Sequence, residues 1–131
     1  MKWDEISFFK KTEFDCKCGC GRNEMDADFM RKLDELRRRF DFPFIVTSGY
    51  RCPEYNSQVS STGLTGPHTT GHAVDLALFG RKVFSVMRHW TLGGWGTGIG
   101  LKQHGPHDKR FIHLDDIPES DSRFRPTVWT Y

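Results

Sequence analysis

The stretch GPHTTGHAVDL, residues 66–76, contains two histidines and an aspartate within eight residues: His68, His72 and Asp75. Two glycines give the chain conformational freedom before and between these side chains, and an apolar run typical of a strand follows. Imidazole and carboxylate groups are common zinc ligands, so the stretch is either a metal site or a turn that happens to be rich in histidine. The rest of the sequence has to decide between the two.

Length and charge limit the classes of protein that need to be considered. A chain of 131 residues, 37% hydrophobic and 14% aromatic, is expected to form one domain over residues 1–131. The net charge of +2 gives no concentrated basic face, so we expect no nucleic-acid partner. No run approaches the roughly 18 apolar residues of a membrane span, so we expect no membrane partner.

Apolar periodicity predicts a small α+β domain. Asp26 is a good N-cap for a helix whose apolar residues recur at helical spacing as far as Phe40, and Asp41-Phe42-Pro43 ends that helix. Further helices are expected at Asp4–Lys10, 54–60 and 83–90, and strands at 44–46, Ala73–Leu78, Ile99–Lys102 and Phe111–Asp115. The expected fold class is helices packed on a small, mostly antiparallel sheet.

A third ligand is available in the sequence RFIHLDD, residues 110–116. His113 has apolar neighbours, as expected in the middle of a strand, which would hold its imidazole in a fixed position. A catalytic zinc ion has three protein ligands and one water. The sequence therefore predicts one zinc ion held by His68, Asp75 and His113. His72 lies three residues before Asp75 and would point to the opposite strand face, so we interpret it as a neighbouring or surface residue.

The order of these motifs resembles the zinc D-alanyl-D-alanine carboxypeptidase family of metallopeptidases. The matching residues are Ser48-Gly49-Tyr50-Arg51, the H-x-x-G-x-A-x-D element from His68 to Asp75, and Phe111-x-His113-x-Asp115. The CGCG sequence and the segment from Arg125 to Trp129 resemble the small, single-domain branch related to phage L-alanyl-D-glutamate endopeptidases. The resemblance, which runs from about Phe14 to Tyr131, implies a single zinc peptidase domain with the hedgehog/D-Ala-D-Ala-peptidase-like fold.

The resemblance also implies roles for residues beside the metal. Arg51 corresponds to the family arginine that faces the substrate, where its planar fork can hold a carboxylate or stabilise an oxyanion. The alternative for Arg51 is an ion pair with a surface acid. Ser48 is a candidate for a hydrogen bond near the site. Asp115 lies two residues after His113, so it either orients that histidine or is a structural acid at the strand end.

One position departs from the family pattern. Many relatives have a glutamate or aspartate three residues before the last zinc histidine, where it serves as general base, but here that residue is Arg110. An arginine cannot accept a proton at working pH. The preceding loop offers Asp108 and His107 as equal candidates for the catalytic base, with His104 behind them. The alternative is that this loop is simply polar and exposed.

The four cysteines raise a separate question. Cys16, Cys18 and Cys20 form a C-x-C-x-C run, and Cys52 follows Arg51. Such a set can close a turn or bind a metal, but all-cysteine zinc sites normally have about two to four residues between ligands. The tight spacing therefore favours reduced thiols, or one disulfide to Cys52, over a second metal. With no visible signal peptide, the redox state stays open.

We therefore expect a zinc-dependent peptidase that cuts bonds involving D-amino acids in bacterial peptidoglycan, as a D,D-carboxypeptidase or an L,D-endopeptidase. Its partner would be the stem peptide, and we expect a monomer. The N-terminal residues show no apolar signal segment, which is typical of a phage or prophage lysis enzyme (an endolysin) that waits in the cytoplasm and acts at the cell wall. A secreted enzyme whose signal was removed is the alternative. The alternative function is a non-catalytic zinc-containing domain of the same fold that binds peptidoglycan or a protein.

Overall fold

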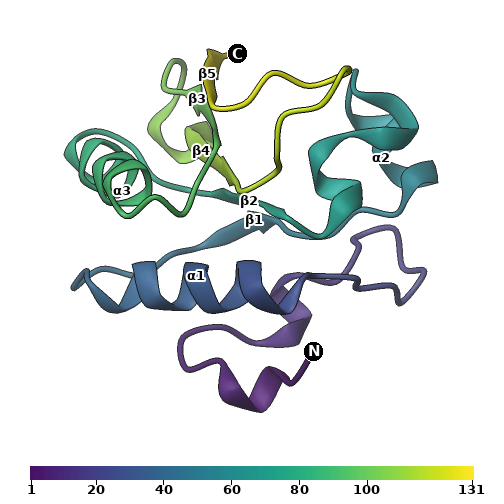
Figure 1. Ribbon diagram of the computed structural model, residues 1–131, viewed down its shortest axis with the longest axis horizontal. Coiled ribbons are helices and arrows are strands. Elements are labelled where there is room, and N and C mark those ends of the chain that lie inside the picture. The colour runs from purple at the N-terminus through teal and green to yellow at the C-terminus, as the bar shows by residue number, and fades with distance from the viewer.

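The computed structural model describes residues 1–131 and contains three helices, five strands and five short 3-10 turns. The elements are α1 (Ala27–Arg38), β1 (Val46–Ser48), α2 (Pro53–Val59), β2 (Ala73–Leu76), α3 (Arg81–Leu92), β3 (Gly98–Lys102), β4 (Phe111–Asp115) and β5 (Thr127–Thr130). Figure 1 shows α1 lying between the sheet and the N-terminal segment, with α2 and α3 at opposite sides. The α+β class expected from the sequence is confirmed. None of the three helices has the length and apolar character that crossing a bilayer requires.

The sheet has the strand order β1-β2-β4-β3-β5. All neighbouring pairs are antiparallel except β3 and β5, which are parallel. In the central β2–β4 pair, Asp75 lies directly opposite His113, and Ala73 lies opposite Asp115. Because the register fixes which residues face each other, two of the three predicted ligands are neighbours across one rung of the sheet.

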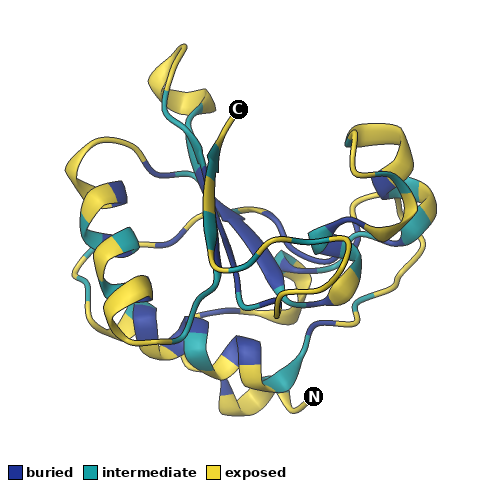
Figure 2. Cartoon of the chain, turned by 45° about the horizontal axis from the view of Figure 1, so that its top comes forward, coloured by how far each residue is buried: buried dark blue, intermediate teal, exposed yellow.

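The core lies on the face of the sheet that α1 covers. Apolar residues of α1, β2 and β4 are completely buried there: Phe29, Met30, Leu33, Leu36, Val74, Leu76, Ile112 and Leu114. Figure 2 shows these buried strands at the centre of the molecule, with the exposed helix faces outside. Successive strand residues point to opposite faces. Asp75 and His113 alternate with the core residues, so they lie on the other face, where the site forms.

The N-terminal segment differs from the sequence expectation of a helix over Asp4–Lys10. The structure has a 3-10 turn at Trp3–Glu5 and non-helical chain after it. The carboxylate of Asp34 on α1 accepts the N–H groups of Ser7, at 3.0 Å, and of Phe8, at 2.8 Å. Because a distant side chain takes these two donors, they do not form helical hydrogen bonds, and the predicted helix is wrong.

Several strand bounds also differ from the prediction: β2 ends at Leu76 and not at Leu78, and β3 begins at Gly98 and not at Ile99. β1 begins at Val46 and not at residue 44, and β5 has no counterpart among the predicted strands. β5 pairs with β3 from Gly98 opposite Thr127 to Leu101 opposite Thr130. This pairing joins strands that are not consecutive in the chain, so no local pattern of turn residues predicts it.

Candidate metal centre

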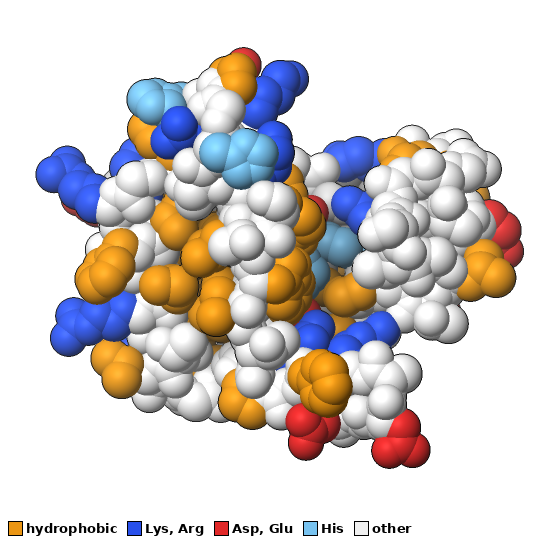
Figure 3. All heavy atoms as spheres, turned by 90° about the horizontal axis from the view of Figure 1, so that it is seen from above, with side chains coloured by type: hydrophobic (Ala, Val, Ile, Leu, Met, Phe, Trp, Pro, Cys, Tyr) orange, Lys and Arg blue, Asp and Glu red, His pale blue; other side chains and the backbone are white.

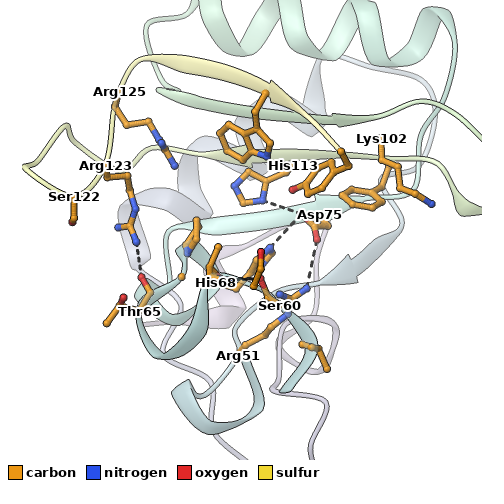
Figure 4. A pocket seen from close by; sticks show the side chains of 18 residues that line it. Arg51, Ser60, Thr65, His68, Asp75, Lys102, His113, Ser122, Arg123 and Arg125 are labelled. Carbon is orange, nitrogen blue, oxygen red and sulfur yellow. Dashed lines mark hydrogen bonds and ion pairs between the residues drawn. The ribbon is translucent and has the colours of Figure 1, made fainter. Parts of the chain in front are cut away.

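Two histidines and one aspartate from three elements meet on the open face of the sheet. His68 comes from the 3-10 turn Pro67–Thr70, Asp75 from β2 and His113 from β4. Oδ1 of Asp75 lies 3.2 Å from Nε2 of His68 and 3.0 Å from Nδ1 of His113. All three residues are buried, with relative exposures of 5%, 6% and 1% for His68, Asp75 and His113. Figure 4 shows the three side chains pointing toward one another.

The spacing of these atoms fits a zinc ion. Ligand atoms about 2.1 Å from a tetrahedral zinc lie about 3.4 Å from one another. The observed separations of 3.0 and 3.2 Å are close to that value, and all donor atoms lie within 4.8 Å of one another. Two imidazole nitrogens and one carboxylate oxygen are donors that zinc prefers, and three protein ligands leave one position for water or substrate. The residues predicted as ligands thus form a group that can hold this metal.

Each histidine is oriented by a hydrogen bond on the side away from the centre. Nδ1 of His68 donates to the carbonyl oxygen of Gly49 at 2.8 Å, and Nε2 of His113 donates to Oδ2 of Asp115 at 2.8 Å. These bonds fix the orientation of each ring, so that the nitrogen facing Asp75 is the one that would bind a metal. Asp115 is completely buried and is itself held by Arg125, whose Nε and Nη2 lie 3.0 and 2.9 Å from its oxygens.

Burial and the neighbouring charges act against each other on these groups. Burial alone would raise the pKa of Asp75, but His68 and His113 outweigh it and hold this pKa well below its usual range. Burial opposes the charging of His113, yet the hydrogen bonds to Asp115 and Asp75 raise the pKa of this histidine above its ordinary value. The two carboxylates therefore favour positive charge between them, which either a proton or a metal ion can supply.

The residues between His68 and Asp75 explain the turn into β2. Gly71 has a φ of 78°, and a Cβ at this position would lie 1.9 Å from the carbonyl oxygen of Glu24, so only glycine fits. His72 points away from the metal centre, and its Nδ1 lies 2.8 Å from Oδ1 of Asp116. His72 is not among the residues whose donor atoms converge.

Arg51 lies beside the donor group. Its Nη2 is 3.8 Å from Oδ2 of Asp75, so its carboxylate neighbour is a buried residue of the site and not a surface acid. Its Nε donates to Oγ of Ser48 at 3.0 Å, and its Nη1 donates to Oδ1 of Asn56 at 3.1 Å. Ser48 therefore affects the site by orienting the guanidinium group of Arg51. Asn56, which is completely buried and also accepts from Arg51, is a contact that the sequence did not predict.

The donor group opens into a cleft of about 830 Å³. Four cationic side chains line it, namely Arg51, Lys102, Arg123 and Arg125, whereas Asp75 is the one acidic residue of the lining. Figure 3 shows the hollow, with histidine atoms inside it and Lys and Arg side chains near it. Arg125 is neutralised by Asp115, but the excess of positive charge still favours an anionic ligand.

The glycines of β3 make space for two contacts that the sequence analysis missed. A Cβ on Gly100 would lie 2.7 Å from the ring of Trp129, which packs beside His113 with a ring-centroid distance of 5.0 Å. A Cβ on Gly98 would lie 2.3 Å from the Asp115 carboxylate. Two glycines at alternate positions of one strand face are the available sequence signal, because they leave room for side chains from neighbouring strands.

The residues considered as general base lie elsewhere. Asp108 and His107 belong to a 3-10 turn before β4, and neither lines the cleft. The ring of His107 stacks on Phe79 with centroids 4.5 Å apart, and Nε2 of His104 lies 3.2 Å from the carbonyl oxygen of Tyr131. The structure thus brings together the three ligands, Arg51, Ser48 and Asp115, but not the base candidates.

Three buried donors that leave one coordination position for water or substrate are typical of catalytic zinc sites in hydrolases. The family follows from comparison with known proteins: the chain belongs to the peptidase M15 family, whose sequence model matches residues 7–115. This membership confirms the resemblance to D-Ala-D-Ala carboxypeptidase-like metallopeptidases and implies metallopeptidase activity. The match includes all three donor residues but ends before β5. No curated protein and no solved structure matches the chain.

Proposed function

We propose that the protein is a zinc-dependent peptidase that hydrolyses peptide bonds involving D-amino acids in bacterial peptidoglycan. The observation that carries this proposal is the buried donor group of His68, Asp75 and His113 at a cationic cleft, in a chain of the peptidase M15 family. The bond that is cut, by a D,D-carboxypeptidase or an L,D-endopeptidase reaction, depends on how the cleft positions the peptide.

The charge and size of the cleft support a short anionic peptide as the substrate. Peptidoglycan stem peptides carry free carboxylates, and the lining has four cations against one acidic side chain. The volume of about 830 Å³ lies within the range of about 300–1,000 Å³ that is typical of small-ligand clefts, so it accommodates a few residues and not a folded protein. The stem peptide is accordingly the proposed partner of a monomeric enzyme.

The side chains of the cleft have separate tasks in this proposal. A bound zinc ion supplies a polarised scissile carbonyl and a water of lowered pKa. Arg51 is fixed by Ser48 and Asn56, so its guanidinium is oriented before the substrate arrives and can stabilise an oxyanion or hold a carboxylate. Tyr131 also lines the cleft, and its phenol, which is protonated at neutral pH, can donate a hydrogen bond to the peptide.

One observation favours a second candidate, a non-catalytic domain that binds wall peptides. Apart from the three metal donors themselves, no carboxylate or imidazole lines the cleft. A general base must reach the attacking water within hydrogen-bond distance. If no such group approaches when substrate binds, the site retains the metal and the cationic walls of a binding module without proton transfer.

We propose that the enzyme acts at the bacterial cell wall, as a phage or prophage lysis enzyme that is released from the cytoplasm of the producing cell. A secreted wall-remodelling enzyme has the same chemistry. Both origins require the same reaction on the same polymer, so the test of function does not depend on which of them applies.

Digestion of purified peptidoglycan tests the proposal. The zinc-loaded protein should release new amino or carboxyl ends that mass spectrometry assigns to one bond of the stem peptide, and a chelator should abolish this release. His113→Ala should release nothing, whereas His72→Ala, which changes a histidine outside the donor group, should cut the same bond. Binding of peptidoglycan without release of any end, from every wall chemotype, would establish the binding module instead.

A further inference from the structure

All four cysteines of the chain converge at one place outside the cleft. Cys16, Cys18 and Cys20 come from the N-terminal loop, and Cys52 comes from the start of α2. Their Sγ atoms lie within 4.8 Å of one another, with 3.5 Å between Cys16 and Cys18 and 3.7 Å between Cys18 and Cys52. None of the four is in a disulfide. We propose that these cysteines bind a second zinc ion in a closed, structural site.

The sulfur positions fit a tetrathiolate. Sulfur ligands about 2.3 Å from a tetrahedral zinc lie about 3.8 Å from one another. The two measured separations, 3.5 and 3.7 Å, are close to that value. A disulfide needs about 2.05 Å between two sulfurs, and it would use only two of the four. A single ion explains why all four thiols lie within 4.8 Å of one another, with two of the separations near the tetrahedral value.

The backbone accommodates the close spacing that counted against a metal in the sequence. Gly19 and Gly21 alternate with the last cysteines of the run and have φ angles of 88° and 77°, which place the chain in the left-handed region. No atom lies within 4 Å of a Cβ built on either glycine, so their role is to turn the chain and not to fit a neighbour. Three ligands can therefore come from one tight loop, and the fourth comes from a distant segment.

Backbone N–H groups also point at the sulfurs. The N–H of Cys52 donates to Sγ of Cys16 at 3.3 Å, and the N–H of Tyr55 donates to Sγ of Cys52 at 3.4 Å. Such bonds stabilise thiolate, the form that binds metal. Cys16 and Cys52 are buried, whereas Cys18 and Cys20 are exposed, so an ion can enter from solvent and be enclosed on its inner side.

The cysteine cluster adjoins a segment that lines the cleft, so a metal ion in the cluster would hold that segment in place. Cys52 directly follows Arg51, whose N–H donates to the carbonyl oxygen of His68 at 3.1 Å. The N–H of Tyr50 donates to the carbonyl oxygen of Phe14 at 2.9 Å, so the two segments that supply the cysteines already run together. A zinc ion here would tie the N-terminal loop to the segment that carries Arg51, without contacting substrate.

Metal counting on purified, reduced protein tests the proposal. Native mass spectrometry and elemental analysis should find about two zinc ions per chain in the wild type, because one site has three protein ligands and the other has four. His113→Ala should retain about one, and Cys18→Ser/Cys20→Ser, which changes only exposed cysteines, should also retain about one. A single variant that combines His113→Ala with Cys18→Ser and Cys20→Ser should retain no zinc.

Cobalt substitution keeps the test independent of whether the cysteine variant folds. The wild type and His113→Ala should both show the thiolate-to-cobalt charge-transfer absorption of a tetrahedral sulfur site. A wild-type protein that binds a single ion and shows no such absorption overturns the proposal. So does rapid reaction of all four thiols with a thiol reagent in metal-loaded native protein, or a mass that reveals a disulfide in protein purified under reducing conditions.

Discussion

Asp115→Asn removes one charge from beside the metal centre with almost no change in side-chain size. Oδ2 of Asp115 accepts from His113 and from Nη2 of Arg125, while Oδ1 accepts from Nε of Arg125. An amide has one acceptor oxygen, so either orientation of the asparagine sets an N–H group against an N–H of the guanidinium. If the amide nitrogen faces His113, the imidazole must carry its hydrogen on Nδ1, the atom that faces the metal position.

The expected loss of stability in Asp115→Asn follows from the burial of its ion pair with Arg125. Asp115 is completely buried and the side chain of Arg125 is 6% exposed, so solvent does not screen the change. Breaking a buried ion pair costs about 3–5 kcal/mol, and we expect a value near 3 kcal/mol in the free energy of unfolding because asparagine keeps one acceptor. Loss of the partner that orients a ligand histidine should weaken zinc binding about 10–100-fold, or about 1.4–2.8 kcal/mol.

Zinc affinity is measured by competition with a chelator, and stability by urea unfolding of the metal-free proteins. The cysteine cluster is unchanged by the substitution, so the difference in zinc affinity between wild type and variant belongs to the histidine centre. Asp116→Asn is the matched control, because this neighbouring carboxylate contacts His72 and Lys32 and no metal ligand. The reasoning is refuted if Asp115→Asn binds zinc as tightly as the wild type, or if Asp116→Asn weakens binding equally.

Three further substitutions test other parts of the site. Arg51→Lys keeps the charge but loses the planar fork, so kcat/KM on peptidoglycan fragments should fall about 10²-fold while zinc content stays unchanged; equal activity would remove Arg51 from the mechanism. Gly71→Ala combines an unfavourable φ with a clash against the carbonyl of Glu24, so thermal unfolding should shift down by about 5 °C or more, and an unshifted Tm would contradict the turn geometry. His72→Ala removes contacts to Asp116, Asp26 and Phe29, none of which is a predicted metal ligand, so zinc content should equal that of the wild type in elemental analysis, and loss of one ion would place this histidine among the ligands.

The three candidate metal donors could be predicted from local patterns together with the resemblance to the zinc D-alanyl-D-alanine carboxypeptidase family, which selected His68 and His113 among the six histidines. The spacing of His68 and Asp75 around a glycine fixes a turn into a strand, and the apolar neighbours of His113 fix a strand of period two. Those two strands then pair in the register that brings Asp75 opposite His113. The helix after Asp26 could be predicted equally well, because its N-cap and the spacing of its apolar residues both indicate a helix that begins there.

The walls of the cleft and the N-terminal segment depend on contacts that no local pattern encodes. Arg123 and Arg125 reach the cleft because β5 pairs with the non-consecutive strand β3, and the helix expected near the N-terminus is replaced because Asp34 takes its backbone donors. The prediction that Asp108 or His107 acts as general base depends on their position in the sequence just before His113. Where these side chains point is decided by packing, such as the stacking of His107 on Phe79, which a position in the sequence does not reveal.

The central claim is that His68, Asp75 and His113 together hold a zinc ion, and anomalous X-ray diffraction at the zinc absorption edge tests it most directly. Crystals of the zinc-loaded protein should show an anomalous peak about 2.0–2.2 Å from Nε2 of His68, a carboxylate oxygen of Asp75 and Nδ1 of His113. A second peak is expected at the cysteine cluster and does not bear on this claim. If zinc-loaded protein that cleaves peptidoglycan shows no peak among the three donor atoms, the account of the metal centre is contradicted.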